Sequence, residues 1–554
     1  MPHIHHLLHR LEELNTIGIA LSSERDISRL LEIILDAAKR ITHADAGTLY
    51  LVEQEQQVLK FEIVRNDTLG IALGGTTGEP VPFYPIRLYD GAGKPNHHTV
   101  VAHAALSGET VNIPDAYSAE GYDFSGTKAF DNKTGYRSTS FLTVPMRNHE
   151  NEIIGVLQLI NAEESDGQIV AFSAADQNLV ESLASQAAIA LTNRRLIKQM
   201  EDLFESFINL INTAIDDKSA YTGGHCQRVP ILTMMLAEAV NRTQQGPLRD
   251  FVMTDKDRYE LKIAGLLHDC GKVTTPVHVV DKATKLHTLF DRIHLIDTRF
   301  EVLKRDAEIA MLRTLSTICP RPLGESGGGE GEDVAAIRAE YDAHIRQLDE
   351  GREFLRHCNT GSEKMAEADR ERVRQIAAYQ WRDTTGQQVD FLSQDELENL
   401  TIPAGTLTAA ERQIINHHID VTIKMLESLP WPKHLKNVSE YAGGHHERMD
   451  GKGYPRGLTR EQMSVQARVM GIADIFEALT AKDRPYKKGK TLTESLFILG
   501  KFKENGHIDP DLFDVFVREK VYLSYAQQFL DPEQIDEVDV RLIPGYDHAV
   551  TPPG

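Results

Sequence analysis

The hydrophobic pattern of the first part of the chain predicts a sheet flanked by helices. Apolar residues recur at helical spacing within residues 11–40. Strand-like apolar stretches follow at residues 46–52, 58–64, 140–145 and 153–160. The polar segment 147–151 predicts a hairpin turn between the last two stretches, and residues 70–94, rich in Gly and Pro, predict a loop. We expect an α+β domain over residues 10–192, with an antiparallel sheet and flanking helices.

A long unbroken helix is predicted next, because residues 173–217 contain neither Pro nor Gly. Apolar side chains recur there in alternating steps of three and four, at Leu179, Leu183, Ala190, Ile197, Met200, Phe204, Phe207, Ile211 and Ala214. A two-stranded coiled coil would bury such a seam, although one helix could also pack it along its own domain. Since the seam continues past the sheet domain, we expect residues 176–217 to form a connecting helix that pairs in a homodimer.

Residues 218–540 are predicted to form an all-α domain. Amphipathic helical patterns lie on both sides of residues 320–333, which are flexible by their Gly-rich composition. We interpret residues 297–405 as an insertion within this domain. The fold class expected for the chain is therefore multidomain, with a sheet domain joined by a long helix to an all-α domain.

Composition and charge narrow the classes of function. The chain has 554 residues and a formal net charge of −22, which argues against binding to a nucleic-acid duplex. An anionic substrate would need a local positive site, such as a metal ion or a small basic cluster. The four cysteines lack the pattern of a disulfide scaffold, and no apolar run reaches the length of a membrane helix. We expect a cytoplasmic protein without membrane contact.

Histidine and aspartate residues gather beside apolar helical patterns in the helical part of the chain. They are His225, His268, Asp269, His417, His418, His445, His446 and Asp474. Imidazoles and carboxylates form a mixed ligand set that suits Fe, Mn, Zn or Ni and poorly suits Mg alone. Asp474 lies inside an apolar helix, where a carboxylate is costly to bury unless it is paired or binds a metal. A carboxylate can bridge two metal ions about 3.5–4 Å apart, which activate a water against a phosphodiester.

Basic residues near these motifs are candidates for phosphate binding. Lys272 follows Asp269 by three residues, so one helical turn would bring its ammonium to the same side, where it could neutralise charge on a phosphate. A second basic group comprises Arg448, Lys452, Arg456, Arg484, Lys487 and Lys488. Most of these are expected to be solvated loop charges. Arg448 and Arg484 are the candidates for contacts with phosphate or guanine.

The motifs resemble those of the HD-GYP family, a branch of the HD phosphohydrolases. The residues that carry the resemblance are His268-Asp269 with Gly271-Lys272, His445-His446-Glu447-Arg448, and Gly453-Tyr454-Pro455. The resemblance implies hydrolysis of cyclic di-GMP to linear pGpG, and further to GMP, at two or three divalent metal ions, Fe or Mn. By position it implies the ligands His225, His268, Asp269, His418, His445, His446 and Asp474. Asp269 would bridge the metals, Lys272 would act on the phosphate, and the Gly-Tyr-Pro loop is linked in the family to contacts with diguanylate cyclase (GGDEF) domains.

Two features of the ligand set stay open. His294 and His417 compete with His418, which we favour because it follows Leu407-Thr408 in the register of the family. His417 would point about 100° away from His418 around a helix. Tyr221 stands where members with three metals carry Glu, so the third metal depends on whether Asp216 or Asp217 reaches the site.

The N-terminal domain resembles GAF domains, a fold of small-molecule sensors, through the stretches 134–138, 141–145 and 155–161. Asn161, Phe172 and Asp176 match the pattern in GAF domains of cyclic-nucleotide phosphodiesterases, whereas Ala162 and Gln177 replace its Lys and Glu. A cyclic nucleotide, another small ligand, and a ligand-free dimer module all remain open for this domain.

The sequence thus predicts a metal-dependent cyclic di-GMP phosphodiesterase under the control of a GAF domain. Two other functions are compatible with it. One is a non-catalytic receptor that binds the dinucleotide and acts through protein contacts. The other is a hydrolase of a different cyclic dinucleotide, such as cyclic GMP-AMP.

Overall fold

The computed structural model of the chain describes residues 15–24, 26–164, 166–218, 224–318, 332–361, 364–481 and 489–546. The chain divides into two compact units, Met1–Phe204 and Glu205–Gly554. Among the described residues, none of the helices combines the length and the apolar character that crossing a bilayer requires.

The first unit contains an antiparallel sheet. Its described strands run in the order β3-β2-β1-β7-β6-β5, with β4 beside β2 and β8 beside β7. They are β1 (Ala44–Glu53), β2 (Val58–Asn66), β3 (Ile71–Gly74), β4 (Ile86–Arg87), β5 (Val111–Ile113), β6 (Phe141–Arg147), β7 (Ile153–Glu163) and β8 (Ile169–Val170). The predicted hairpin joins β6 to β7, where Arg147 pairs with Ile153. The segment expected to be a loop contains β3 and β4, which are too short for a hydrophobic period to reveal.

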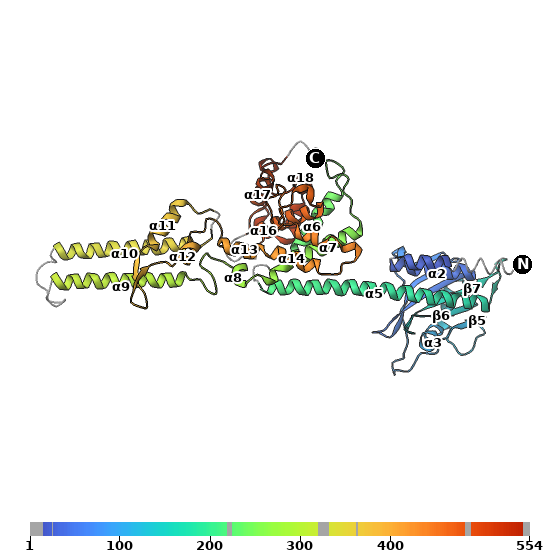
Figure 1. The fold of residues 1–554 in the computed structure, drawn as a ribbon. Helices are drawn as coiled ribbons and strands as arrows, with labels where there is room; N and C mark the ends of the chain where they lie inside the picture. Colours follow the sequence, from blue (N-terminus) through green and yellow to red (C-terminus); the bar gives the residue numbers. More distant parts are fainter. Residues whose placement is uncertain are drawn as a thin grey trace. The chain divides into compact units, whose positions relative to one another are not determined.

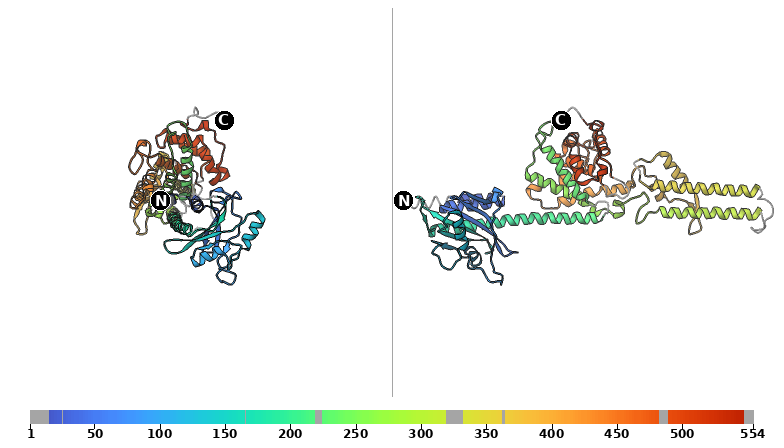
Figure 2. Two further views of the ribbon diagram at one scale, coloured as in Figure 1. Left: turned by 90° about the vertical axis from the view of Figure 1, so that its right-hand side faces the viewer. Right: turned by 180° about the vertical axis from the view of Figure 1, so that it is seen from behind.

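Helices cover both faces of this sheet (Figures 1 and 2). The carboxylate of Asp26 caps α2 (Ile27–Thr42), whose apolar face shares a core with β1, β6, β7 and the first turns of α5 (Ala174–Lys218). On the other face, α3 (Val100–Ser107) packs on Tyr50, Leu59 and Val156, and α4 (Ser125–Thr134) lies beside it. The predicted antiparallel sheet with flanking helices is confirmed.

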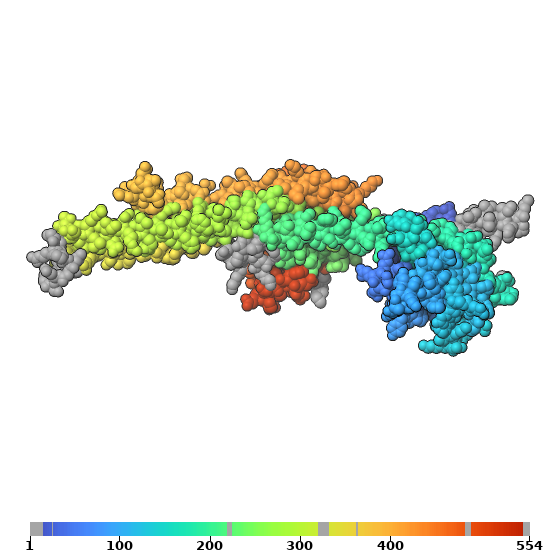
Figure 3. All heavy atoms as spheres, turned by 90° about the horizontal axis from the view of Figure 1, so that it is seen from below, coloured from blue at the N-terminus to red at the C-terminus, as the bar shows by residue number. Residues whose placement is uncertain are grey.

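Helix α5 has two differently buried parts. Leu183 and Ala187 are fully buried in the core of the first unit, so Leu183 cannot belong to an exposed seam as the sequence suggested. Further along, large apolar side chains are exposed, and four of them, at residues 197, 200, 207 and 211, are predicted seam positions. The exposed set is Ile189, Leu196, Ile197, Met200, Leu203, Phe207, Leu210 and Ile211. In Figure 3 this stretch of α5, coloured between cyan and green, lies at the surface of the molecule. Its exposed stripe is therefore offset from the predicted one in the first turns.

The second unit is helical, as predicted. The helices that carry the candidate site are α6 (His225–Asn241), α7 (Asp255–Leu267), α14 (His418–Glu427), α15 (Val438–Gly443) and α16 (Val465–Thr480), with the short η2 (Cys270–Thr274). Behind them lie α17 (Leu492–Glu504), α18 (Pro510–Arg518) and α19 (Val521–Phe529). Phe476 of α16 packs against Phe516 and Tyr525 of this C-terminal group, which supports the helix that carries Asp474.

A segment with its own core stands between α8 (Val277–Val280) and α13 (Ala409–Asn416). It comprises α9 (Ile293–Ile318), α10 (Glu332–Asn359), α11 (Glu367–Ala377), the hairpin of β9 (Gln380–Arg382) and β10 (Gln388–Asp390), and α12 (Gln394–Leu400). In Figures 1 and 2, α9 and α10 lie side by side. Where the inserted segment joins α13, the ammonium of buried Lys282 is 2.7 Å from Glu411 Oε2. The hairpin is a local departure from the all-α expectation.

Candidate metal centre

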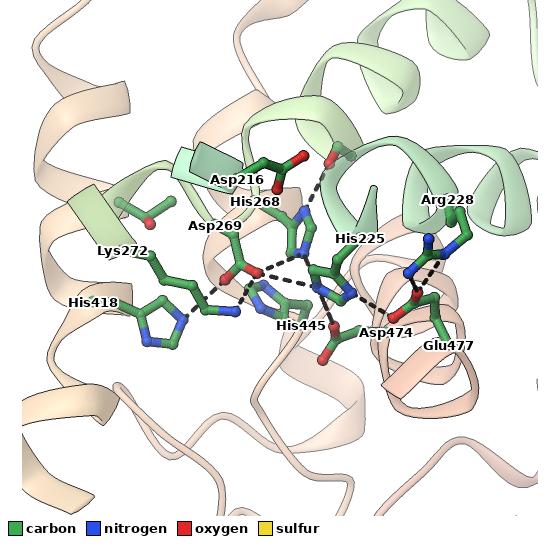
Figure 4. Close-up of polar contacts among 12 residues, drawn as sticks. Asp216, His225, Arg228, His268, Asp269, Lys272, His418, His445, Asp474 and Glu477 are labelled. Atoms are coloured by element: carbon green, nitrogen blue, oxygen red, sulfur yellow. Dashed lines mark hydrogen bonds and ion pairs between the residues drawn. The ribbon is translucent and has the colours of Figure 1, made fainter. Parts of the chain in front are cut away.

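Residues from five separate helical segments converge in the second unit (Figure 4). His225 and His418 are the first residues of α6 and α14, His268 and Asp269 follow α7, His445 and His446 follow α15, and Asp474 lies in α16. Their ligand atoms form two groups, each within 4.8 Å. One group is His225, His268 and Asp269, and the other is His418, His445 and His446.

Asp269 lies between the two groups. Its Oδ2 is 3.2 Å from Nε2 of His225 and 3.2 Å from Nε2 of His268. Its Oδ1 is 3.2 Å from Nε2 of His418. Asp474 Oδ1 lies 3.3 Å from His225 Nε2. One carboxylate thus offers an oxygen to each group, which is the arrangement that a bridging ligand needs.

Three of the histidines are each oriented by a backbone carbonyl three residues earlier in the chain. His268 Nδ1 donates to Gly265 O at 2.7 Å, His418 Nδ1 to Ile415 O at 2.5 Å, and His445 Nδ1 to Ala442 O at 2.6 Å. Because Nδ1 carries the proton in each neutral ring, Nε2 presents a lone pair to the cluster.

Two of these Nε2 atoms and one carboxylate oxygen lack a hydrogen-bond partner. Among the described residues, Nε2 of His418, Nε2 of His445 and Oδ1 of Asp269 are buried without one, whereas Nε2 of His268 lies 3.3 Å from Nε2 of His225. His418 Nε2 and Asp269 Oδ1 lie 3.2 Å apart with no hydrogen bond between them. Such an arrangement is costly unless a cation satisfies both atoms. The donor set therefore fits divalent metal ions.

His225 is held differently, by a carboxylate. Its Nδ1 is 2.5 Å from Oε2 of Glu477, a residue that is 1% exposed, and Arg228 Nε donates to Glu477 Oε1 at 2.7 Å. A carboxylate on the outer nitrogen is a common way to orient a metal-binding imidazole. The sequence analysis missed Glu477, although its position three residues after Asp474 puts it on the same face of α16.

The protonation of the imidazoles differs across the cluster. Burial disfavours the charged form of His225, but Glu477, Asp269 and Asp474 outweigh it and raise the pKa of His225 well above its ordinary value. Burial and the neighbouring His446 lower the pKa of His445 well below its ordinary value, and burial lowers the pKa of His446 to about 4. His445 and His446 are thus neutral at neutral pH, whereas His225 must release a proton to bind a cation.

Lys272 lies at the edge of the cluster. Its Nζ is 2.5 Å from Asp269 Oδ2. Burial favours the neutral amine, but Asp269 and Asp474 overcome it and raise the pKa of Lys272. A permanent positive charge therefore stands beside the bridging carboxylate.

The rival candidates for the remaining ligand lie elsewhere. The side chain of His417 is 67% exposed and contacts Asp420, and that of His294 on α9 is 78% exposed. Of His294, His417 and His418, only His418 belongs to the two groups of ligand atoms around Asp269. Asp216 lies in the last turn of α5 beside α6, whereas Asp217 is exposed. Tyr221 and Arg484 lie outside the described residues.

A cleft of about 460 Å³ opens beside the cluster. Its lining includes His446, Arg448, Lys452, Tyr454, Asp474, Lys490 and His507. The ring of Tyr454 stacks on His446 with centroids 4.9 Å apart. Arg448 is oriented by Asp450, which accepts from its Nη2 at 2.8 Å. Basic side chains and two candidate ligands thus share one cavity in an acidic protein.

The first unit holds a second cavity, of about 470 Å³, between the sheet and the helices α3 and α4. Aromatic walls come from Tyr50, Phe61, Phe83, Phe124, Phe130, Tyr136 and Phe141. Two polar groups on these walls are partnered within the fold: Tyr136 Oη is 2.5 Å from Asp45 Oδ2, and Gln158 Oε1 accepts from Tyr50 Oη at 3.2 Å. Polar side chains such as Arg65, Asp123 and Thr127 also line the cavity, so it combines aromatic walls with polar groups.

Comparison with known protein families identifies a different kind of domain in each part of the chain. A model of the GAF domain matches residues 26–191, and two models of the HD domain match residues 222–321 and 395–512. The chain combines a GAF domain with an HD domain. The predicted GAF domain, the predicted HD-superfamily domain and the predicted fold class are confirmed. The two HD matches flank residues 322–394, which contain α10 and α11 of the inserted segment.

Curated relatives share parts of the chain. A cyclic di-GMP phosphodiesterase of Pseudomonas aeruginosa is 39% identical over 114 residues, which are 21% of this chain and 26% of the relative. A 3'3'-cGAMP-specific phosphodiesterase of Vibrio cholerae is 46% identical over 81 residues, 15% of this chain and 19% of the relative. The GAF domain of an Acinetobacter phosphoenolpyruvate-protein phosphotransferase matches 34% of this chain and 98% of its own, with 18% identity and a TM-score of 0.26. The chain therefore spans only about a quarter or less of these two curated relatives.

Proposed function

We propose that the chain is a metal-dependent phosphodiesterase that hydrolyses cyclic di-GMP to linear pGpG, and further to GMP. The observation that carries this proposal is the set of buried, unpaired ligand atoms around Asp269, next to a cleft lined by basic side chains. Buried acceptor atoms without hydrogen-bond donors indicate a cation site, and a cleft lined by Arg448, Lys452 and Lys490 in a chain of net charge −22 indicates an anionic substrate.

The proposed cofactor is a pair of divalent ions. Imidazole nitrogens and carboxylate oxygens suit Fe, Mn, Zn or Ni, and the resemblance to the HD-GYP family favours Fe or Mn. His225, His268 and Asp474 would hold one ion, His418, His445 and His446 the other, and Asp269 would contact both. When bound, such ions supply a polarised water and neutralise phosphate oxygens. A third ion stays a prediction, since residue 221 lies outside the described residues.

The chain's own groups supply binding and charge. Lys272 is half-buried beside Asp269 and stays charged, so it can hold a non-bridging phosphate oxygen as negative charge develops there. Arg448 is fixed by Asp450 at the rim of the cleft, where it can contact the second phosphate or a guanine edge. Tyr454 offers an aromatic wall on which a base can stack. Arg484 stays a predicted contact.

The identity of the dinucleotide has a second candidate. The relatives include cyclic di-GMP phosphodiesterases and 3'3'-cGAMP-specific phosphodiesterases. Cyclic GMP-AMP is therefore the second substrate to assay. Equal concentrations of both dinucleotides, compared by kcat/KM, separate the two functions, and we expect the larger value for cyclic di-GMP.

The GAF domain is proposed to bind a small molecule in its aromatic cavity, either a cyclic nucleotide or another planar compound. The cavity volume of about 470 Å³ and its aromatic walls suit a ring of nucleobase size. A rise in the thermal stability of the GAF domain with cAMP or cGMP, absent with ribose 5-phosphate, would support the cyclic nucleotide.

A homodimer is proposed through α5. Ile189, Leu196, Leu203 and Leu210 repeat every seven residues and are exposed, with Met200 and Phe207 completing the stripe. A second α5 in parallel would bury this stripe as a coiled coil. Light scattering of the full chain and of Leu203→Lys tests this: we expect a dimer for the first and a monomer for the second. Contacts with GGDEF domains and a cytoplasmic location stay predictions from the sequence.

The central experiment uses the full chain purified without oxygen. We expect two equivalents of Fe or Mn per chain and formation of pGpG from cyclic di-GMP. Asp269→Ala should lose both, whereas His417→Ala, which changes an exposed imidazole next to the cluster, should keep both. A metal-free wild-type chain that binds the dinucleotide and leaves it intact would contradict the enzyme and favour a receptor.

A further inference from the structure

The last turn of α5 contacts the backbone on two sides of the metal centre. Asp216 Oδ2 accepts a hydrogen bond from the N–H of Gly224 at 3.2 Å, and Gly224 is the residue directly before His225 (Figure 4 shows Asp216 and His225). The Lys218 ammonium donates to the carbonyl of Val273, directly after Lys272. One helical turn thus contacts the backbone directly before a candidate metal ligand and directly after the candidate phosphate-binding residue.

His225 depends on remote groups more than the other histidines do. His268, His418 and His445 are each oriented by a carbonyl three residues earlier in the chain. His225 is oriented by Glu477, 252 residues away, and the backbone before it is held by Asp216. A shift of α5 would therefore move the backbone at His225 and leave the local anchors of the other three unchanged.

The buried face of α5 is also incompletely satisfied in this position. Asn212, one turn before Asp216, is 2% exposed, and neither its amide nitrogen nor its amide oxygen has a hydrogen-bond partner among the described residues. Ile208 and Ile215 on either side are buried as well. A buried amide without partners is costly. The Asn212 amide therefore disfavours the described position of α5, whereas the burial of Ile208 and Ile215 favours it.

We propose that Asp216 is a positioning residue for His225, and that Asp216 and Lys218 together make the last turn of α5 the point at which the connecting helix sets the geometry of the metal centre. The same helix begins in the core of the GAF domain, where Leu183 and Ala187 are fully buried. A change in the GAF core that moves α5 reaches His225 and Lys272 through these two contacts. The inference rests on the proposed metal centre.

The test compares variants of the full chain by metal release to a chelator and by steady-state kinetics. Asp216→Ala removes the acceptor for the Gly224 N–H, so we expect about 10–100-fold weaker binding of one of the two ions, as for other outer-shell groups, with the second ion unchanged. Asp216→Asn keeps an acceptor oxygen and should bind that ion within about threefold of the wild-type chain. Asp217→Asn, the same charge change at the exposed neighbouring residue, should match the wild-type chain.

A further variant acts in the opposite direction. Asn212→Leu replaces the unpartnered amide by an apolar side chain of similar size, so it should favour the described position of α5 and slow release of the same ion several-fold. Release that is unchanged or faster in Asn212→Leu would overturn the proposal.

Two other outcomes also decide the matter. Metal release that is identical in the wild-type chain, Asp216→Ala and Asp217→Asn would overturn the positioning role while leaving the proposed enzyme intact. A loss in Asp216→Asn as large as in Asp216→Ala would overturn it as well, because the carboxylate charge rather than the hydrogen bond to Gly224 would then matter. A wild-type chain that binds no metal would instead overturn the proposed function, and this inference with it.

Discussion

The metal centre of the HD domain and the sheet of the GAF domain bury polar groups in opposite ways. In the GAF domain, Asn161 is 1% exposed, accepts from the N–H of Thr139 at 2.7 Å and donates to Tyr136 Oη at 2.9 Å. In the HD domain, Nε2 of His418 and Nε2 of His445 are as deeply buried and have no partner among the described residues. These groups are similarly buried, but Asn161 forms hydrogen bonds and the two imidazole nitrogens do not.

This difference separates structural groups from ligand-binding groups. Buried polar atoms that form hydrogen bonds with one another stabilise a fold, whereas buried acceptor atoms that converge without hydrogen-bond donors indicate a cation site. Removing a group should therefore have different consequences in the two regions. In the HD domain it should remove metal and activity, and in the GAF domain it should reduce stability.

The largest effect is expected from His418→Ala. It removes one of the unpaired nitrogens, so metal binding and phosphodiesterase activity should fall by more than the roughly 10–100-fold that outer-shell groups supply. His417→Ala is the matched control, because that side chain is 67% exposed. Metal content and the rate of pGpG formation measure both variants. Equal loss in the two variants would break the distinction between buried and exposed imidazoles.

A smaller loss is expected from Glu477→Gln. The amide keeps the size of the side chain but removes the charge that His225 and Arg228 share. We expect about 10–100-fold weaker binding of one metal ion, with the fold retained by circular dichroism. Unchanged affinity in a chelator titration would mean that Glu477 is a structural group, like those of the GAF domain.

Short motifs at the ends of helices indicate candidate ligands in the sequence. His268-Asp269 and His445-His446 are adjacent in the chain, and the resemblance to the HD-GYP family implied their partners His225, His418 and Asp474 by position. Glu477 could not be found that way, since its role depends on which nitrogen of His225 faces α16. The offset of the exposed stripe on α5 was missed for a similar reason: Leu183 fits a heptad, but the GAF core already buries it.

The insertion illustrates the same limit. Composition gave its approximate place through the Gly-rich residues 320–333, but its own core around Phe300, Leu355 and Phe391 depends on contacts between segments far apart in sequence. Hydrophobic periodicity reports the buried face of a helix and does not report which partner covers it.

Metal affinity should depend on pH with a defined sign. The raised pKa of His225 means that the metal-free protein carries a proton there at neutral pH, and binding must release it. Affinity should therefore rise by up to about tenfold per pH unit while that proton is displaced. His446, with a pKa of about 4, is already neutral above pH 5 and should add nothing in this range. Calorimetry in buffers of different ionisation enthalpy measures the released proton, and its absence would contradict this assignment.

The smallest effect is expected in the GAF domain. Asn161→Ala leaves the N–H of Thr139 without its acceptor and removes one of the two partners of Tyr136 Oη, so the domain should lose about 1–3 kcal/mol of stability. Hydrogen exchange of the sheet measures this loss in the full chain. Metal content should be unchanged. If Asn161→Ala also removed metal, the two regions would not differ as proposed.

The central claim is that a pair of metal ions lies between the two histidine groups with Asp269 in contact with both. Anomalous X-ray diffraction from crystals of the anaerobically purified chain, recorded at the Fe and Mn edges, tests it most directly. The account predicts two anomalous peaks, one beside His268 and one beside His445, with Asp269 between them. Ordered density for these side chains without any anomalous peak would contradict it.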